Sequence, residues 1–449
     1  MQGTSFIYRD FSLDTDRRVA SFRYTIETDQ QPFDLCETLT FPDALPDTQA
    51  IAKLLRALHI GLGISYYKAF LPPIITHPYQ MDSAEASFWN TVFKHGLGEL
   101  LYKNKLPAGR LAAFKAQDGT AIDGADTTRW HEEALLGIGG GKDSIVAGEL
   151  LKQLDIPLKG FVLATGTNKG QSQSVADVMK VDLLAVERRL DQQIIEIGKL
   201  PNTYNGHVPI SMVFAFVGCV LAAQTGSSYV VVANEASASI PQVTSDNGSV
   251  NHQWSKSLDF EKLFQDYIHQ NVSNKLHYFS AIRPLTSVAV AKLFATHKPY
   301  FEVFTSDNAL FKIKQGQREH PRWSIDSPKS LSSYVLLSPW IADDDLLRIF
   351  GRNFLNEPLD ELFLSLLGET DTPILDCVGT PDELRLSLSL LDRQGRAGNS
   401  HLMQLAKDKH LLAPDVDAEL ARVLEPATDH ALPDTLTNTL LDHIRKDLA

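Results

Sequence analysis

The stretch GGGKDS at residues 139–144 constrains this chain more than any other part of its sequence. It follows a short apolar run, residues 134–138, and precedes a helical pattern over residues 145–154. Three glycines between a buried strand and a helix allow a tight turn that presents backbone N–H groups outward. The helix adds the positive end of its dipole. The stretch therefore predicts a phosphate-binding loop.

We expect this loop to bind a nucleotide through Gly139, Gly140, Gly141, Lys142, Asp143 and Ser144. Lys142 supplies a cation and Ser144 a hydroxyl donor. The carboxylate of Asp143 would repel a phosphate, so its expected role is to cap the helix or to hold Mg²⁺. A glycine-rich turn with Asp143 as a plain helix cap is the alternative without a nucleotide.

Two familiar phosphate motifs are excluded by their spacing. A Walker A loop needs Gly where Leu136 stands and Ser or Thr where Asp143 stands. A dinucleotide fingerprint that begins at Gly137 needs a third glycine at Lys142. The stretch instead resembles the PP-loop of N-type ATP pyrophosphatases, Ser-Gly-Gly-x-Asp-Ser, with Gly139 in place of the first Ser.

The resemblance to a PP-loop implies cleavage of ATP between its α and β phosphates. Pyrophosphate leaves, and AMP is transferred to a carboxylate or a carbonyl oxygen. In proteins of this kind the second strand and the turn after it contact the adenosine. Here these residues are Leu163, Ala164, Thr165 and Gly166.

The hydrophobic pattern predicts three regions. Residues 1–128 form an N-terminal α+β domain, in which residues 22–26 and 33–41 alternate as a β-hairpin and residues 51–62 follow a helical period. Residues 129–342 alternate strand and helix, which predicts an α/β domain with a parallel sheet. Residues 343–449 form a mostly helical C-terminal part. The expected fold class is thus α/β, a parallel-sheet PP-loop domain with these two additions.

Two further polar segments fall where a parallel sheet presents its ligands. Asn205, Gly206 and His207 precede a long apolar helix that starts at Ile210, and residues 234–238 follow the apolar run YVVVA. We expect Asn234, Glu235 and Ser237 at the C-terminal edge of the sheet, where such proteins bind ligands. A turn, a loop histidine and helix caps are the alternatives for these residues.

GGGKDS, NGHVP and NEASAS, in this order and spacing, resemble the family of UDP-N-acetyl-α-D-muramoyl-L-alanyl-L-glutamate epimerases. The resemblance includes the stretches ISYYKAF and GLGELLYKNKLP. It implies that ATP adenylates the α-carboxylate of the terminal L-Glu of a UDP-muramoyl dipeptide. The adenylate delocalises a carbanion as an enolate, so an acid–base pair can invert the centre. Water then releases AMP and the D-product, in peptidoglycan precursor synthesis. The expected cofactors are ATP and Mg²⁺, with Asp143 as the metal ligand.

Glu235 and His207 are the expected acid–base residues, ahead of Cys219, His252 and Lys256. Cys219 lies inside an apolar helical stretch, which favours a buried packing role. Lys68 and Arg283 are expected to pair with anionic groups of the substrate, although surface charge is the alternative for either one. The resemblance implies that some members of the family have cysteines at the positions of Ser324, Ser327 and Ser330, so we expect no thiolate zinc site there.

Composition limits the remaining functions. With 42 basic and 55 acidic side chains, the net charge of −13 disfavours nucleic acid and anionic membranes as partners. Three cysteines and an N-terminus without an apolar leader predict a reduced, cytoplasmic protein, and no obligate protein partner is expected. A PP-loop amide ligase, a PP-loop enzyme of RNA modification and a non-catalytic nucleotide-binding module stay as rivals. The acidic surface and the lack of a CxxC pair argue against RNA modification.

Overall fold

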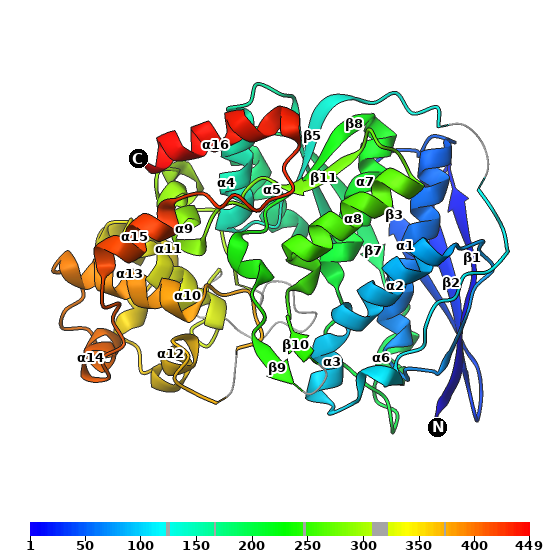
Figure 1. The fold of residues 1–449 in the computed structure, drawn as a ribbon, viewed down its shortest axis with the longest axis horizontal. Helices are drawn as coiled ribbons and strands as arrows, with labels where there is room; N and C mark the ends of the chain where they lie inside the picture. Colours follow the sequence, from blue (N-terminus) through cyan, green and yellow to red (C-terminus); the bar gives the residue numbers. More distant parts are fainter. Residues whose placement is uncertain (123–125, 166–167, 246–247, 308–321, 372–373) are drawn as a thin grey trace.

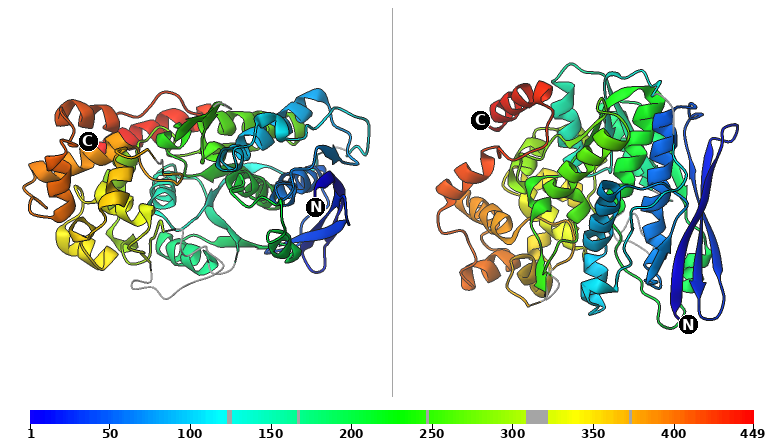
Figure 2. Two further views of the ribbon diagram at one scale, coloured as in Figure 1. Left: turned by 90° about the horizontal axis from the view of Figure 1, so that it is seen from below. Right: turned by 45° about the vertical axis from the view of Figure 1, so that its right-hand side comes forward.

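The computed structural model describes residues 1–122, 126–165, 168–245, 248–307, 322–371 and 374–449. Helices flank a central sheet (Figure 1). The N-terminal strands stand at one end of the molecule and the helices of the last part of the chain at the other (Figure 2). Among the described residues, no helix has both the length and the apolar character that a bilayer span requires.

One sheet organises the molecule. Within the described residues its nine strands run in the spatial order β11 (His277–Ser280), β8 (Ser227–Val232), β5 (His131–Gly137), β6 (Leu158–Ala164), β7 (Leu183–Arg189), β3 (Phe33–Thr40), β2 (Val19–Thr28), β1 (Gly3–Asp14) and β4 (Ile74–Thr76). The first five are mutually parallel. The next pairs, from β7 to β1, are antiparallel, and β4 pairs in parallel with β1.

The parallel half confirms the predicted alternation of strand and helix. Between its strands lie α4 (Lys142–Lys152), α5 (Asn168–Met179) and α7 (Ile210–Thr225). From β5 the chain adds β6 and β7 on one side, then crosses to add β8 and β11 on the other. The order therefore reverses between β5 and β8. In open parallel sheets, ligands bind beyond the carboxyl ends of the strands at such a reversal.

Both faces of the parallel half are covered by helices. Leu135 and Val230 belong to one buried cluster, which also includes residues of α1 (Gln49–Tyr67), α7 and α8 (Leu258–Asn271). Their neighbours Leu136 and Val231 belong to the other, with residues of α4 and α9 (Ser287–Ala295). Successive side chains of a strand point to opposite faces, so these strands must be apolar throughout.

The predicted N-terminal hairpin is confirmed, because β2 and β3 pair antiparallel. The structure adds β1, whose Phe6 and Tyr8 complete the buried face of the hairpin. The helix expected over residues 51–62 is α1. Two further helices follow in this region, α2 (Ser83–Gly96) and α3 (Gly98–Lys103), which are separated at Leu97.

The expected boundary at residue 128 does not separate two sheets. Thr38, Leu39 and Thr40 of β3 pair with β7, so the N-terminal strands continue the parallel sheet. Beside this junction, Arg188 Nε lies 2.5 Å from Glu37 Oε1, and both side chains are almost fully buried. The same guanidinium also donates, through Nη2, to Ser65 Oγ of α1 at 3.1 Å. The junction is therefore part of the interior.

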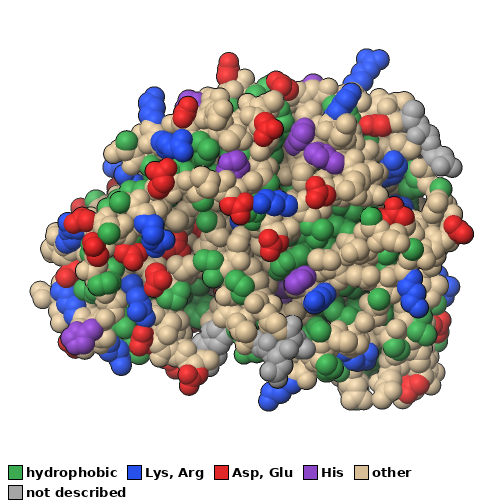
Figure 3. All heavy atoms as spheres, viewed as in Figure 1, with side chains coloured by type: hydrophobic (Ala, Val, Ile, Leu, Met, Phe, Trp, Pro, Cys, Tyr) green, Lys and Arg blue, Asp and Glu red, His purple; other side chains and the backbone are tan. Residues whose placement is uncertain are grey.

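The C-terminal part is helical, as predicted, although its first helix begins before residue 343. Its helices are α10 (Pro328–Leu337), α11 (Asp343–Phe350), α12 (Asp360–Leu366), α13 (Pro381–Arg393), α14 (His401–Asp408), α15 (Val416–Leu424) and α16 (Asp434–Leu448). They pack on the cluster that contains α4 and α9. On the face seen in Figure 3, acidic and basic side chains are interspersed over these helices and over the sheet region.

Candidate functional site

The glycine-rich loop lies between β5 and α4, at the point where the strand order reverses. Gly140 has a φ of +91°, and a Cβ there would lie 2.7 Å from Gln171 Cγ. Gly141 is the N-cap residue of α4, so Asp143 lies in the first turn and is not the helix cap. Thr305 N–H donates to Gly140 O at 3.0 Å, which fixes the loop from outside.

Two side chains of the loop are turned inward. Lys142 is only 5% exposed, and its Nζ donates to Asp143 Oδ1 at 2.5 Å. Burial alone would lower the pKa of Lys142, but the charges of Asp143 and Glu235 outweigh it and raise that pKa. Ser144 Oγ donates to Gly141 O at 3.0 Å. The loop thus combines a helix N-terminus with a buried cation.

The segment after β8 lies across the reversal from this loop. Ser280 Oγ accepts from Asn234 N–H at 2.8 Å and donates to Asn234 O at 2.7 Å, which ties the segment to β11. Glu235 follows, immediately before the short helix η2 (Ala236–Ser239). Its Oε1 accepts from Ser237 Oγ at 2.7 Å and from Ser287 Oγ at 2.5 Å. Its Oε2 is buried and has no hydrogen-bond partner among the described residues.

Burial raises the pKa of Glu235 to about 7, and the negative charges of Asp143 and Glu383 add to this effect. Glu383 is in the first turn of α13, where it forms a capping box with Thr380. Its Oε1 accepts from Ser287 N–H at 2.6 Å. The start of α13 is therefore attached to the start of α9 beside the Glu235 carboxyl group.

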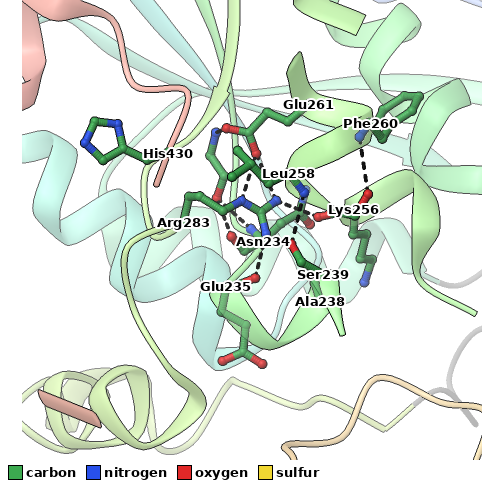
Figure 4. Close-up of polar contacts among 12 residues, drawn as sticks. Asn234, Glu235, Ala238, Ser239, Lys256, Leu258, Phe260, Glu261, Arg283 and His430 are labelled. Atoms are coloured by element: carbon green, nitrogen blue, oxygen red, sulfur yellow. Dashed lines mark hydrogen bonds and ion pairs between the residues drawn. The ribbon is translucent and has the colours of Figure 1, made fainter. Parts of the chain in front are cut away.

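Arg283 does not reach this site with its guanidinium. It is 1% exposed, and its Nη2 lies 2.8 Å from Glu261 Oε2 in a buried ion pair. Other donors of the same group bind Glu235 O at 2.7 Å and Lys256 O at 2.5 Å. Figure 4 shows the Glu235 carboxyl group directed away from Arg283. The expectation that Arg283 pairs with a substrate anion is not supported, because its donors bind interior acceptors.

A second group of titratable side chains joins distant segments. We call Glu99, His207, His252, Lys256, Asp376 and Cys377 the imidazole–thiol cluster. Glu99 Oε2 accepts from His252 Nδ1 and lies 4.0 Å from His207 Nδ1. The ring centroids of the two histidines are 4.2 Å apart. His252, Asp376 and Cys377 each offer one atom that could bind a metal, and these three atoms lie within 4.8 Å of one another. The same is true of Glu99, His207 and His252.

The cluster is electrostatically organised. Burial would raise the pKa of Glu99, but hydrogen bonds from His252 and Lys103 lower it to about 2. Burial and the neighbouring His252 lower the pKa of His207 to about 4. Lys256 Nζ donates to Cys377 Sγ at 3.4 Å. The pKa of Lys256 is raised, mainly by Cys377. Asp143 and Asp376 make smaller contributions in the same direction, and together these three outweigh burial, which would lower this pKa.

Lys68 brings the NGHVP segment to α1. It follows the last residue of α1, and its Nζ donates to Gly206 O at 2.6 Å and to Asn205 Oδ1 at 3.5 Å. Burial, and then the charge of Arg188, lowers the pKa of Lys68 to about 8. The structure therefore brings Lys68 to the segment of Asn205 and Gly206, two features that the sequence singled out separately.

The other expected residues have varied surroundings. Leu163 is fully buried in β6 and packs in the core, Ala164 is buried at the end of that strand, and Thr165 is exposed. Gly166 lies outside the described residues. Cys219 is fully buried in α7, and burial raises the pKa of its thiol. This agrees with a packing role.

The three serines near residue 324 lie at the start of α10. Ser324 N–H donates to Asp307 Oδ2 at 2.8 Å, and Ser327 is the N-cap residue of α10. Ser330 is fully buried, and its Oγ has no hydrogen-bond partner among the described residues. Hydroxyl groups occupy all three positions, so the segment cannot supply thiolate ligands.

Several residues of the site were not found by sequence reasoning. Cys377, Asp376, Ser287 and Glu383 carry no motif and stand outside the segments that the sequence singled out. Glu99 was noted only within a family-like stretch. The Thr-x-x-Glu spacing of residues 380–383 predicts a capping box and therefore the start of a helix. This spacing does not indicate that the start of the helix lies beside Glu235.

Comparisons with known proteins cover most of the chain. A family model described as the MurL N-terminal domain matches residues 1–281, and one described as the MurL C-terminal domain matches residues 303–419. A relative from Xanthomonas oryzae pv. oryzae is 34% identical over 401 residues, which cover 87% of this chain and 86% of the relative. Relatives from Salinispora tropica and a Micromonospora species are 29% and 28% identical, over 88% and 96% of this chain. All three are named UDP-N-acetyl-alpha-D-muramoyl-L-alanyl-L-glutamate epimerase.

Proposed function

This chain belongs to the MurL family, and from that premise we propose that it inverts the terminal L-Glu of UDP-MurNAc-L-Ala-L-Glu to D-Glu. The proposal includes the use of ATP through an acyl adenylate, with release of AMP and pyrophosphate, in peptidoglycan precursor synthesis. The names of the relatives support the epimerisation and the substrate. The use of ATP is supported by the glycine-rich loop.

The observation that carries the use of ATP is the position of this loop. It lies at the strand reversal, where Gly140 adopts a positive φ and Lys142 is buried in the first turn of α4. Backbone N–H groups at a helix N-terminus bind phosphate without further side chains. We assign the triphosphate of ATP to the loop, and the adenosine to the neighbouring end of β6.

The residues also fit Mg²⁺. Asp143 offers a carboxylate, an oxygen ligand of the kind that Mg²⁺ prefers, and one or two carboxylates suffice when phosphates complete the coordination. When bound with ATP, the cation would neutralise phosphate charge and assist departure of pyrophosphate. Lys142 holds the Asp143 carboxylate at 2.5 Å and thereby orients it.

Adenylation explains why an epimerase would consume ATP. A free carboxylate is a poor activator of its Cα proton, because removal of the proton would place a second negative charge beside the first. The adenylated carboxyl group carries no such charge and accepts the electron pair as an enolate oxygen. Proton transfer on two faces then needs two side chains close to the phosphate end of ATP. Glu235, beside Lys142, and His207, in the imidazole–thiol cluster, remain candidates.

A single incubation tests the proposal. Purified protein, ATP, Mg²⁺ and UDP-MurNAc-L-Ala-L-Glu are mixed in D₂O, and pyrophosphate release is followed together with deuterium at Cα. We expect pyrophosphate and a D-product with one deuterium. Asp143→Ala and Ser144→Ala should abolish pyrophosphate release without unfolding the protein, whereas Asp177→Ala, an exposed carboxylate on α5, should not.

The same incubation separates the rivals. Pyrophosphate without deuterium, and dependent on an added amine, would indicate an amide ligase. Pyrophosphate release that requires RNA would indicate RNA modification. Nucleotide binding without any pyrophosphate would indicate a non-catalytic module, and it would refute the proposed function.

A further inference from the structure

We propose that Lys68 and Lys256 together bind the γ-carboxylate of the terminal L-Glu, and that this contact directs the α-carboxylate to ATP. The inference rests on the proposed function and adds a specificity site to it. The sequence left open which anionic group Lys68 contacts, and it did not place Lys256 at the same group.

A series of contacts connects the two lysines. Lys68 Nζ donates at 2.6 Å to the carbonyl oxygen of the residue immediately before His207. The ring of His207 lies against that of His252, with centroids 4.2 Å apart. One ring nitrogen of His252 lies within 4.8 Å of Cys377 Sγ, which accepts from Lys256 Nζ at 3.4 Å. The two ammonium groups therefore belong to one site, with His207 between them along this series.

Both lysines also act on His207 electrostatically. Burial and His252 are the main causes of the low pKa of His207, and the charges of Lys256 and Lys68 lower it further, although Glu99 acts in the opposite direction. Two positive charges are therefore close enough to influence the same ring. A ligand that lies beside this ring is within the field of both.

The acidic groups nearby are already paired with other cations. Glu99 Oε1 pairs with Lys103 Nζ, and Asp376 Oδ1 lies 3.6 Å from Lys329 Nζ. By contrast, in the part of the chain that the structure describes, neither lysine of the proposed site forms an ion pair with a carboxylate. Both side chains are half-buried. A partly desolvated ammonium group without a counter-charge favours an anionic ligand.

The chemistry of the substrate indicates which anion this is. In the proposed reaction the α-carboxylate is adenylated at the glycine-rich loop, and the terminal glutamate carries a second carboxylate three bonds beyond Cα. Lys256 is close to that loop, because Asp143 contributes to its raised pKa, although less than Cys377 does. Figure 4 shows the side chain of Lys256 extending away from Arg283. The diphosphate of UDP is separated from Cα by the muramoyl and alanyl units, so the γ-carboxylate is the nearer anion.

A bound γ-carboxylate accounts for the choice between two similar groups. Either carboxylate of the terminal residue could attack ATP, but only activation of the α-carboxyl group acidifies the Cα proton. Ammonium groups that hold the γ-carboxylate leave the α-carboxylate free to meet the α-phosphate. Charge-assisted hydrogen bonds from two donors also restrict the orientation of the glutamate side chain.

The test compares two ligands that differ only in this charge. UDP-MurNAc-L-Ala-L-Glu and UDP-MurNAc-L-Ala-L-Gln are titrated calorimetrically into the full-length protein with a saturating non-hydrolysable ATP analogue and Mg²⁺. At pH 7 Lys68 is protonated, because burial lowers its pKa only to about 8. The wild-type protein should bind the L-Glu ligand at least about tenfold more tightly, because the amide cannot form hydrogen bonds between charged groups.

Lys68→Gln and Lys256→Gln should each weaken binding of the L-Glu ligand about tenfold and leave that of the L-Gln ligand within about twofold. A merely structural role would weaken both ligands alike. Lys275→Gln is the matched control, since this exposed lysine lies two residues before β11, at the amino ends of the parallel strands. It should bind both ligands as the wild-type protein does.

Each other outcome has a defined meaning. An unchanged preference for the L-Glu ligand in either variant would overturn the shared site. Equal losses for both ligands would overturn it as well, and weaker binding of UDP alone in the same variants would then assign the lysines to the diphosphate. Absence of pyrophosphate release by the wild-type protein with substrate, ATP and Mg²⁺ would instead refute the proposed function.

Discussion

The stability of Glu235→Gln relative to that of the wild-type protein should be greater at pH 8 than at pH 5. Burial raises the pKa of Glu235 from 4.5 to about 7 in the folded protein. The folded state therefore holds this proton more tightly than the unfolded state does. The resulting stabilisation is complete below pH 4.5 and is lost as the pH rises to about 7. Glutamine cannot ionise, so the variant escapes the loss.

The magnitude follows from the same numbers. The interval from 4.5 to about 7, at about 1.4 kcal/mol per pH unit, corresponds to about 3 kcal/mol. Because Glu235 is half-buried, we take this as an upper limit. Unfolding entropy of about 2.1 cal/mol/K per residue gives about 0.9 kcal/mol per kelvin for 449 residues. The Tm difference between variant and wild type should thus grow by at most about 3 °C from pH 5 to pH 8.

Differential scanning calorimetry without ATP and Mg²⁺ measures this double difference. Changes in the hydrogen bonds of residue 235 shift the Tm of the variant equally at both pH values, so they cancel from this double difference. Glu187→Gln, an exposed carboxylate whose side chain is 47% exposed, serves as the control and should show no such trend. A Tm difference that is independent of pH, or that falls toward pH 8, would refute the reasoning.

Two further substitutions test other parts of the structure. Gly140→Ala should weaken binding of a non-hydrolysable ATP analogue at least about tenfold, because its φ is +91° and its Cβ would lie 2.7 Å from Gln171 Cγ. Gly109→Ala, between α3 and β5, whose Cβ would contact nothing within 4 Å, should bind normally in the same calorimetric titration, and equal losses would contradict this view. Arg283→Met should cost about 3–5 kcal/mol in denaturant unfolding, because it leaves Glu261 buried and unpaired. A second substitution, Glu261→Leu, should restore most of that stability, and failure to do so would argue against an uncompensated charge.

Local patterns were sufficient to predict most secondary structure. The alternation of β2 and β3, the period of α1 and the strand–loop–helix around Gly139 all depend on neighbours a few residues apart. The glycine-rich loop was found for the same reason. Its residues are consecutive in the sequence, and the sheet only determines where the loop lies in the fold.

Contacts between distant segments were beyond this reasoning. Cys377 and Lys256 are 121 positions apart, and no periodicity links them. Arg283 looked like a substrate ligand because a sequence does not show that Glu261 lies opposite it in the interior. The division at residue 128 failed to anticipate the pairing of β3 with β7, since strand partners are chosen by the whole fold.

The pairing of β3 with β7 also determines where the chain can be divided. A fragment that begins at residue 129 would keep the parallel strands but lose β3, leaving the outer edge of β7 with unpaired backbone groups. It would also leave Arg188 without Glu37. Open strand edges recruit other strands and promote aggregation. The N-terminal hairpin thus covers the outer edge of β7, and the glycine-rich loop is best studied in a protein that retains this hairpin.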